Sequence, residues 1–221
     1  MTDTTDTTKP ADTAESTDLA ALRERIVRLE WNQFQRTNNE GGRAACQGNW
    51  PVFHQMRLAQ FLTWNRPLLE SYADDLDAAD RKGRNLVTEK YGRMMASTAP
   101  DYYARNIEPY IPRLSAGRVA RQERVIATQV AWARDFRTRY PRLGEAMRVL
   151  TTSEDTPAAT SFETYLRGEL GTYADRTFAL YEAMIARRTR NITEETLLHT
   201  VRLGGFTDLD EAEYAQAPVT A

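Results

Sequence analysis

Apolar residues recur at intervals of three and four along almost the whole chain, and this periodicity is the strongest constraint on its fold. Such intervals place side chains on one face of an α-helix, whereas a half-buried strand needs strict alternation. Few stretches alternate, and Val and Ile are sparse. The sequence therefore predicts an all-α fold, with one compact multi-helix domain over residues 19–214.

Capping residues, prolines and glycines divide this pattern into separate helices. Pro67 either kinks a helix that follows Pro51 or opens a new one at its first turn. Asn85 is a candidate cap for the next helix, and Val119 is expected to face inward from a later one. The expected helices cover residues 19–37, 52–66, 67–83, 86–97, 115–140, 143–150, 161–184 and 193–203.

The two ends of the chain lack this pattern. Residues 1–18 are acidic and rich in Thr, with no periodicity and no large apolar side chains, which predicts a disordered N-terminal tail. Residues 215–221 are expected to form a short C-terminal tail. The N-terminus has no apolar segment of the kind found in secretory signals.

Composition excludes several classes of protein. With 29 basic and 31 acidic residues the net charge is −2, which argues against a nucleic-acid partner. No run of about eighteen apolar residues exists to span a membrane, so we expect a cytoplasmic protein. The single cysteine excludes an internal disulfide, and with only His54 and His199 we expect no metal site and no cofactor.

The chain also resembles itself. The sequence of residues 60–74 aligns without a gap with that of residues 161–175, and Tyr72-Ala73-Asp74 falls on Tyr173-Ala174-Asp175. The likeness extends to residues 31–75 and 132–176. It predicts two similar helical halves about a pseudo-two-fold axis, with a groove between them for a ligand.

Two carboxylates occupy the apolar faces of predicted helices. Glu30 lies four residues after Ile26 and four before Phe34, and Glu169 is flanked at the same spacing by aromatic residues. A buried carboxylate is costly unless it is paired. The pair either fixes the helix register or supplies a general acid or base. Possible partners are Arg43, Arg57, Arg84 and Arg167.

The stretch "NNEGGRAACQGNW", residues 38–50, follows the first predicted helix. Its asparagines and glycines are typical of a helix C-cap and a turn. The other interpretation is a ligand site, in which backbone amides and the side chains of Asn38, Arg43 and Gln47 bind a substrate. Cys46 is either a small apolar residue or a nucleophile with His54 as its base.

Aromatic and amide side chains on the same helices could enclose a substrate, although each could equally be an ordinary core residue. We expect Glu30, Glu169 and Cys46 as catalytic candidates. The substrate-binding candidates are Trp31, Asn38, Arg43, Gln47, Arg57, Gln60, Trp64, Arg84, Asn85, Tyr91, Tyr165, Arg167 and Tyr173, with Tyr72 beside them.

From about Leu22 to Tyr214 the sequence resembles a bacterial family, domain of unknown function 4125, whose name implies no activity. His54 falls where histidine is not expected in that family, which puts a Cys46–His54 mechanism in doubt. The matching motifs are Glu30-Trp31, Gly41-Gly42-Arg43-Ala44, Cys46-Gln47, Met56-Arg57, Gln60-Phe61, Trp64, Gly83-Arg84-Asn85-Leu86, Lys90-Tyr91, Glu163-Thr164-Tyr165 and Arg167-Gly168-Glu169-Leu170.

These observations favour a cofactor-independent enzyme that acts on a small polar metabolite, carboxylate-bearing and amino-acid-like. Arg43, Arg57 or Arg167 would hold the carboxylate, and Glu30 or Glu169 would move a proton. The alternatives are a non-catalytic helical module that binds a ligand or a partner protein, and a haem- or metal-dependent protein. The sequence leaves the oligomeric state open.

Overall fold

The computed structural model describes residues 10–37 and 45–216, which contain eleven α-helices, three short 3-10 helices and no β-strand. The prediction of an all-α fold is confirmed. The helices are α1 (Pro10–Gln35), η1 (Ala45–Gly48), α2 (Trp50–Leu62), α3 (Arg66–Arg81), α4 (Leu86–Thr98), α5 (Pro100–Asn106), η2 (Glu108–Tyr110), α6 (Ala116–Arg139), α7 (Pro141–Glu145), η3 (Thr152–Glu154), α8 (Phe162–Leu170), α9 (Asp175–Arg187), α10 (Ile192–Leu203) and α11 (Leu209–Ala215).

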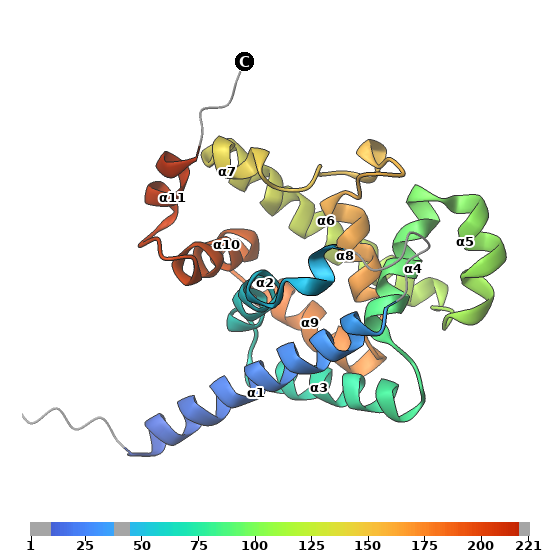
Figure 1. Ribbon diagram of the computed structural model, residues 1–221, viewed down its shortest axis with the longest axis horizontal. Coiled ribbons are helices and arrows are strands. Elements are labelled where there is room, and N and C mark those ends of the chain that lie inside the picture. The colour runs from blue at the N-terminus through green and yellow to red at the C-terminus, as the bar shows by residue number, and fades with distance from the viewer. Residues whose placement is uncertain (1–9, 38–44, 217–221) are drawn as a thin grey trace, which may run out of the picture.

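The helices surround a principal core (Figure 1). Helix α1 runs alongside α3, and α8 packs between α4 and α6, while α7, α10 and α11 gather on the opposite side from α5. The core buries apolar side chains from α1, α2, α3, α6, α8 and α9, including Phe61, Leu69, Leu170 and Phe178. A smaller cluster around Phe136 joins α6 and α7 to α10 and α11.

Most helix starts follow the local chemistry of the sequence. The side chains of Asn65, Asn85 and Ser115 accept hydrogen bonds from backbone N–H groups in the first turns of α3, α4 and α6. Pro67 lies in the first turn of α3, so it opens a new helix rather than kinking the preceding one. Gly83, with φ of 67°, follows α3 in the left-handed conformation that glycine tolerates.

The first helix is longer than expected. Helix α1 begins at Pro10, so residues 10–18 belong to a helix and not to the predicted tail. Pro10 suits a first helical turn, and Arg66 holds the segment through Asp18 and the backbone carbonyl of Glu15. Residues 1–9 and 217–221 lie outside the described residues.

Other helices differ from the prediction in their bounds, number or exposure. The helix expected over 161–184 is two helices, because α8 ends at Leu170 and α9 begins at Asp175. The helix expected over 143–150 is the short α7, and α11 has no counterpart among the predicted helices. Val119 is 41% exposed and does not face the core.

The internal likeness does not extend to the positions of the helix breaks. Residues 60–74 span the end of α2 and the first half of α3, whereas residues 161–175 cover α8 and the break that follows it. The two stretches therefore share a sequence pattern without sharing local structure. The pseudo-two-fold axis stays a prediction.

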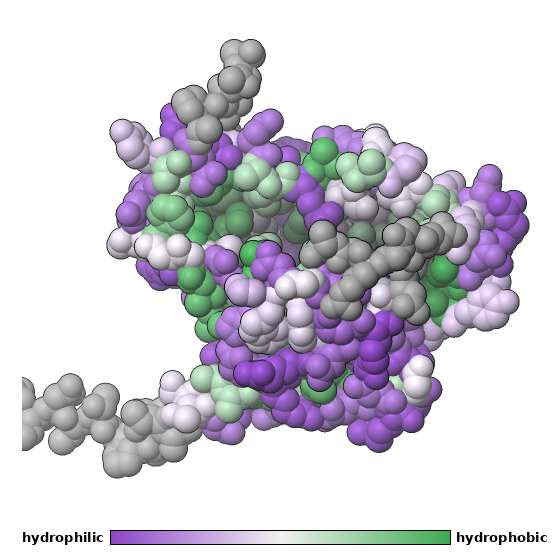
Figure 2. Space-filling view, viewed as in Figure 1, coloured by the Kyte–Doolittle hydropathy of each residue, from purple (hydrophilic) through white to green (hydrophobic). Residues whose placement is uncertain are grey.

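The surface differs from one side of the molecule to the other. In Figure 2 the region over α1 and α3 is mainly hydrophilic, and hydrophobic residues gather on the side that α2, α10 and α11 form. Val52, Met56 and Leu203 are exposed apolar side chains of α2 and α10. Within the described part of the chain, no helix combines the length and the apolar character needed to cross a membrane.

Candidate functional site

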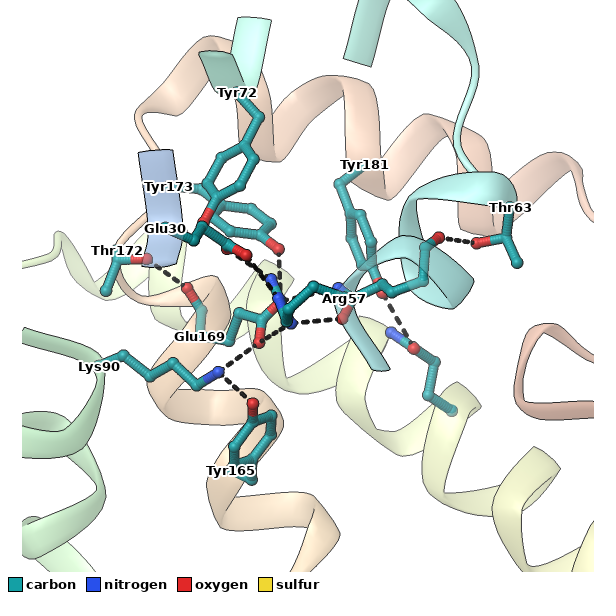
Figure 3. Close-up of polar contacts among 12 residues, drawn as sticks. Glu30, Arg57, Thr63, Tyr72, Lys90, Tyr165, Glu169, Thr172, Tyr173 and Tyr181 are labelled. Atoms are coloured by element: carbon teal, nitrogen blue, oxygen red, sulfur yellow. Dashed lines mark hydrogen bonds and ion pairs between the residues drawn. The ribbon is translucent and has the colours of Figure 1, made fainter. Parts of the chain in front are cut away.

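Arg57 stands at the centre of a buried polar network, between the carboxylates of Glu30 and Glu169 (Figure 3). Its Nε and Nη2 each donate to an oxygen of Glu30 at 2.6 Å, and Nη1 and Nη2 each donate to an oxygen of Glu169 at 3.3 Å. All three residues are at most 7% exposed. Both carboxylates singled out from the sequence therefore share one arginine.

The guanidinium of Arg57 has no donor to spare. A fifth hydrogen bond runs from Nη1 to Oε1 of Gln60 at 2.6 Å, so all five N–H groups are used. Arg57 also lies over the ring of Phe61. It cannot grip a ligand carboxylate without releasing one of its own partners, and its place in the network is that of a support.

Helical spacing brings these side chains together. Arg57 and Gln60 are three residues apart on α2, and Tyr165 and Glu169 are four apart on α8, so each pair shares a face. Glu30 comes from the C-terminal half of α1. The site thus depends on the mutual packing of helices far apart in the chain.

Two buried tyrosines complete the carboxylates' hydrogen bonds. The hydroxyl of Tyr72 donates to Glu30 at 2.6 Å, and that of Tyr173 donates to Glu169 at 3.0 Å. Their ring centroids lie 5.1 Å apart. Burial, reinforced by Glu30, raises the pKa of Tyr72 well above its ordinary range, and burial with Glu169 does the same to the pKa of Tyr173. Both hydroxyls thus remain neutral donors.

Lys90 extends the network toward the surface. Its Nζ donates to Oε2 of Glu169 at 2.8 Å and also to the hydroxyl oxygen of Tyr165 (Figure 3). Lys90 is buried, whereas Tyr165 is half-buried. The chain Glu169–Lys90–Tyr165 therefore leads from the core to the edge of the protein.

The network is electrically balanced, with two carboxylates and two cations. Burial opposes ionisation of Glu169, but Arg57 and Lys90 outweigh it and hold its pKa well below the usual range. Burial opposes the charges of Arg57 and Lys90 in turn, and the facing carboxylates still raise both pKa values. Glu169 is therefore an ionised support at neutral pH rather than a proton donor.

Arg148 and Tyr91 lie near the outer end of this chain. The guanidinium carbon of Arg148 is 4.8 Å from the ring centroid of Tyr165, and the residue is exposed. Arg148 donates to the backbone carbonyl of Thr160 and has no carboxylate partner in the part of the chain that the structure describes. Tyr91 is half-buried and lies against Phe34.

Three of the predicted binding residues have structural roles elsewhere. Arg84 forms two hydrogen bonds with Glu89, and Asn85 caps α4 while donating to the backbone carbonyl of Gln33. Arg167 is held by two glutamates, one of which is Glu123 at 2.8 Å. Each of these side chains therefore has its own set of partners, outside the network around Arg57.

Other candidates pack the interior. Gln47 is 1% exposed, and its Nε2 donates to the carbonyls of Phe34 and Thr37 at the end of α1. Trp31 packs with Trp50 and other rings. Trp64 lies among buried aromatic residues beside the network, including Tyr72 and Tyr173.

The ligand site expected over residues 38–50 lies only in part within the described residues. Asn38 and Arg43 lie outside the described residues. Cys46 is exposed, and the described residues show no hydrogen bond between it and His54. His54 pairs instead with Glu24 on α1, at 2.8 Å. The Cys46–His54 pair expected as one alternative does not form.

Lys90 is the principal residue that the sequence reasoning did not select. It lies four residues after Leu86 and four before Met94, both buried, which is the same signal that identified Glu30 and Glu169. Arg148 carried no such signal, because it is an exposed arginine that only the fold brings to Tyr165.

The network encloses its own charges rather than lining an open hollow. One hollow of about 320 Å³ lies between α4, α5 and the start of α6, and another of about 400 Å³ lies along α1. Glu30, Arg57 and Glu169 line neither of them. Among the described residues, no group of three or more His, Cys, Asp or Glu side chains is placed to hold a metal ion.

Comparison with known families gives one match. Residues 20–214 match the family described as protein of unknown function (DUF4125), and the chain belongs to that family. Neither the curated proteins nor the solved structures give a match.

Proposed function

We propose that this member of the DUF4125 family is an enzyme that acts on a small, polar, carboxylate-bearing metabolite of the amino-acid type. The reaction is acid–base chemistry at the outer end of the network, where Lys90 meets Tyr165. The proposal places the substrate beside Arg148 and Tyr91, at the edge of the protein. We expect the protein to act in the cytoplasm.

One observation carries the proposal: among the described residues, two N–H or O–H donors at this end have no hydrogen-bond acceptor, although the ammonium of Lys90 also lies 3.7 Å from the ring centroid of Tyr165. Lys90 has three N–H groups and uses two, on Glu169 and Tyr165. Because an ammonium can only donate, the oxygen of Tyr165 accepts, and its own O–H must point elsewhere. Within the described residues neither remaining donor has an acceptor. A carboxylate is an acceptor-only group and suits both.

The residues then take distinct roles. Tyr165 gives its proton to the substrate, and the ammonium of Lys90 stabilises the phenolate that remains. Glu169 keeps Lys90 charged, and Arg57 in turn holds Glu169 in its ionised form. Tyr165 is the catalytic residue, and the others position or charge it.

Arg148 supplies the charge that would bind the substrate. Its guanidinium lies over Tyr165, it is exposed, and no described carboxylate neutralises it. Arginine recognises carboxylates through two parallel hydrogen bonds. This assignment replaces Arg57 and Arg167 as the carboxylate grip, because both guanidinium groups already donate to glutamates, and also to Gln60 and Thr152 respectively.

The test is a panel of amino acids, hydroxy acids and oxo acids, screened against the purified full-length protein. Binding is read by thermal shift and calorimetry, and conversion is followed by NMR. For an acid that is converted, Tyr165→Phe should bind it within a few-fold of wild type and lower turnover by roughly 10²–10⁴-fold. Arg148→Gln should instead weaken binding about tenfold or more.

Matched controls keep the result interpretable. Tyr214→Phe and Arg134→Gln make the same changes at exposed positions on α11 and α6, and both should behave as wild type. Normal turnover by Tyr165→Phe would refute the catalytic role. A panel in which nothing is bound or converted would refute the substrate class.

A non-catalytic binding module is the second candidate, and the occupied donors of Arg57 favour it, since they suit a structural role. It predicts acids that bind in an Arg148-dependent manner and are never converted. A visible spectrum and metal analysis of the same preparation test the cofactor-free form of the proposal, which a Soret band or stoichiometric metal would overturn.

A further inference from the structure

The smaller of the two hollows lies between α4, α5 and the start of α6. Its volume is about 320 Å³, and Arg93, Tyr103, Glu108, Arg113 and Val119 are among the residues that line it. This volume is at the lower end of the range for small-molecule sites. The lining therefore has room for a small ligand.

The hollow carries more positive than negative charge. Arg93 and Arg113 contribute two guanidinium groups against the one carboxylate of Glu108. Arg93 donates to the backbone carbonyl of Pro112 at 2.6 Å, while its buried Nε has no partner in the described residues. No described carboxylate forms an ion pair with Arg93 or Arg113, so both charges lack a counter-ion.

A third arginine neighbours the lining along α6. Arg118 precedes Val119 on α6 and is 5% exposed, yet its Nε and Nη1 have no hydrogen-bond partner among the described residues. The nearest carboxylate, that of Asp175, is 3.8 Å away and almost wholly exposed. This long, exposed contact is the one ion pair that Arg118 makes among the described residues, and its guanidinium also lies over the ring of Phe178, 3.5 Å from the centroid. Burial lowers the pKa of Arg118 to about 10, and it lowers the pKa of Arg93 as well.

The backbone at the end of α8 lies close to the side chains of Arg93 and Arg118. A Cβ added at Gly171 would lie 2.7 Å from Cδ of Arg93, so the end of α8 comes close to Arg93 only because it has no side chain there. Arg118 donates to the carbonyls of Leu170 and Tyr173 at the same end of α8. These carbonyls offer partial negative charge, which falls short of balancing the cations.

We propose that this hollow binds a phosphoryl group, carried by a small hydroxylated phosphate ester or by free phosphate. A phosphoryl group presents three oxygens and close to two negative charges, which match the forks of Arg93 and Arg113. Glu108, the one acidic group of the lining, accepts from hydroxyl groups of the ester. The site is distinct from the proposed catalytic end, because Lys90, Tyr165 and Arg148 are not among the residues that line the hollow.

The experiment titrates the full-length protein with inorganic phosphate and with glycerol 3-phosphate, at constant ionic strength set with sodium chloride. Calorimetry and thermal unfolding are the readouts, and neither depends on enzymatic activity. We expect saturable binding with a rise in melting temperature. Tighter binding of glycerol 3-phosphate assigns the hollow to an ester, and equal or tighter binding of phosphate assigns it to the free ion.

Variants test whether the binding is at this hollow. Arg113→Gln changes an exposed side chain and should lower affinity at least tenfold, as should Arg93→Gln. Arg105→Gln, on the exposed end of α5, is the matched control and should bind as wild type. Absence of saturable binding by both probes, or unchanged affinity in Arg113→Gln, would overturn the proposal while leaving the proposed catalytic end untouched.

Discussion

Replacing Arg57 by Met tests whether the central arginine holds the network together. Methionine keeps the apolar stem of the side chain but removes all five donors. Among the described residues, Glu30 then keeps Tyr72 as its one partner, while Glu169 keeps Lys90, Gln60 and Tyr173. The buried cluster changes from neutral to one net negative charge.

The expected loss of unfolding free energy follows from this uncompensated charge. Removing one member of a buried ion pair costs about 3–5 kcal/mol, because the partner stays buried without its counter-charge. Whole-protein stabilities are about 5–15 kcal/mol, so the loss is a large fraction of the total. Adding Glu30→Gln restores neutrality, since Lys90 and Glu169 remain as a pair. The double variant should regain at least about 2 kcal/mol relative to Arg57→Met alone.

Urea unfolding followed by far-ultraviolet circular dichroism measures the effect. With a slope of about 2 kcal/mol per molar urea, the midpoint of Arg57→Met should fall by about 1.5–2.5 M. Arg25→Met is the matched control, because Arg25 pairs with Asp77 at the surface, where such pairs contribute about 0–1 kcal/mol. Equal midpoints for Arg57→Met and Arg25→Met, or purely additive effects in the double variant, would refute the reasoning.

Three further predictions concern the same helices. The folded-state pKa of Glu169 is below its unfolded value, so the stabilisation that the ionised carboxylate provides is present above about pH 4.3 and is lost as the pH falls below it. Glu169→Gln should therefore flatten the decline of the unfolding free energy between pH 4 and 2. An unchanged dependence of that free energy on pH would contradict this. Gly168→Ala should cost about 1–3 kcal/mol, since a Cβ would meet the backbone oxygen of Lys90 at 2.8 Å, whereas Gly117→Ala meets nothing within 4 Å and should leave the melting temperature unchanged or higher. Asn85→Ala removes the cap of α4 and should cost about 1–2 kcal/mol in the same melting assay without altering ligand binding, and a selective loss of binding would return Asn85 to the site.

The fold class and two members of the site follow from sequence alone, for a definite physical reason. Glu30 and Glu169 stand on apolar helix faces, where a charge is costly, so burial and pairing were predictable. The choice of Arg57 from four candidate arginines was not, because it depends on which helices pack together. Lys90 could have been found by the same spacing argument.

The break between α8 and α9 shows a different limit. The apolar stripe continues through residues 161–184, which predicts one helix, yet the chain turns after Leu170. Gly168 contacts α4 and Gly171 contacts Arg93, so the turn is fixed by close approach to other helices. In the sequence these glycines are only weak helix formers, and their role appears once the neighbouring helices are in place.

The distance along the chain between the members of the network has a consequence for folding. Arg57 bonds to Glu30, 27 residues before it, and to Glu169, 112 residues after it. No early intermediate built from α1 to α4 can neutralise all four charges, because α8 is made last among the contributing helices. The dry core should therefore close in a single late, cooperative step, and the most protected amides of α1, α2, α4 and α8 should share one free energy of opening in hydrogen exchange.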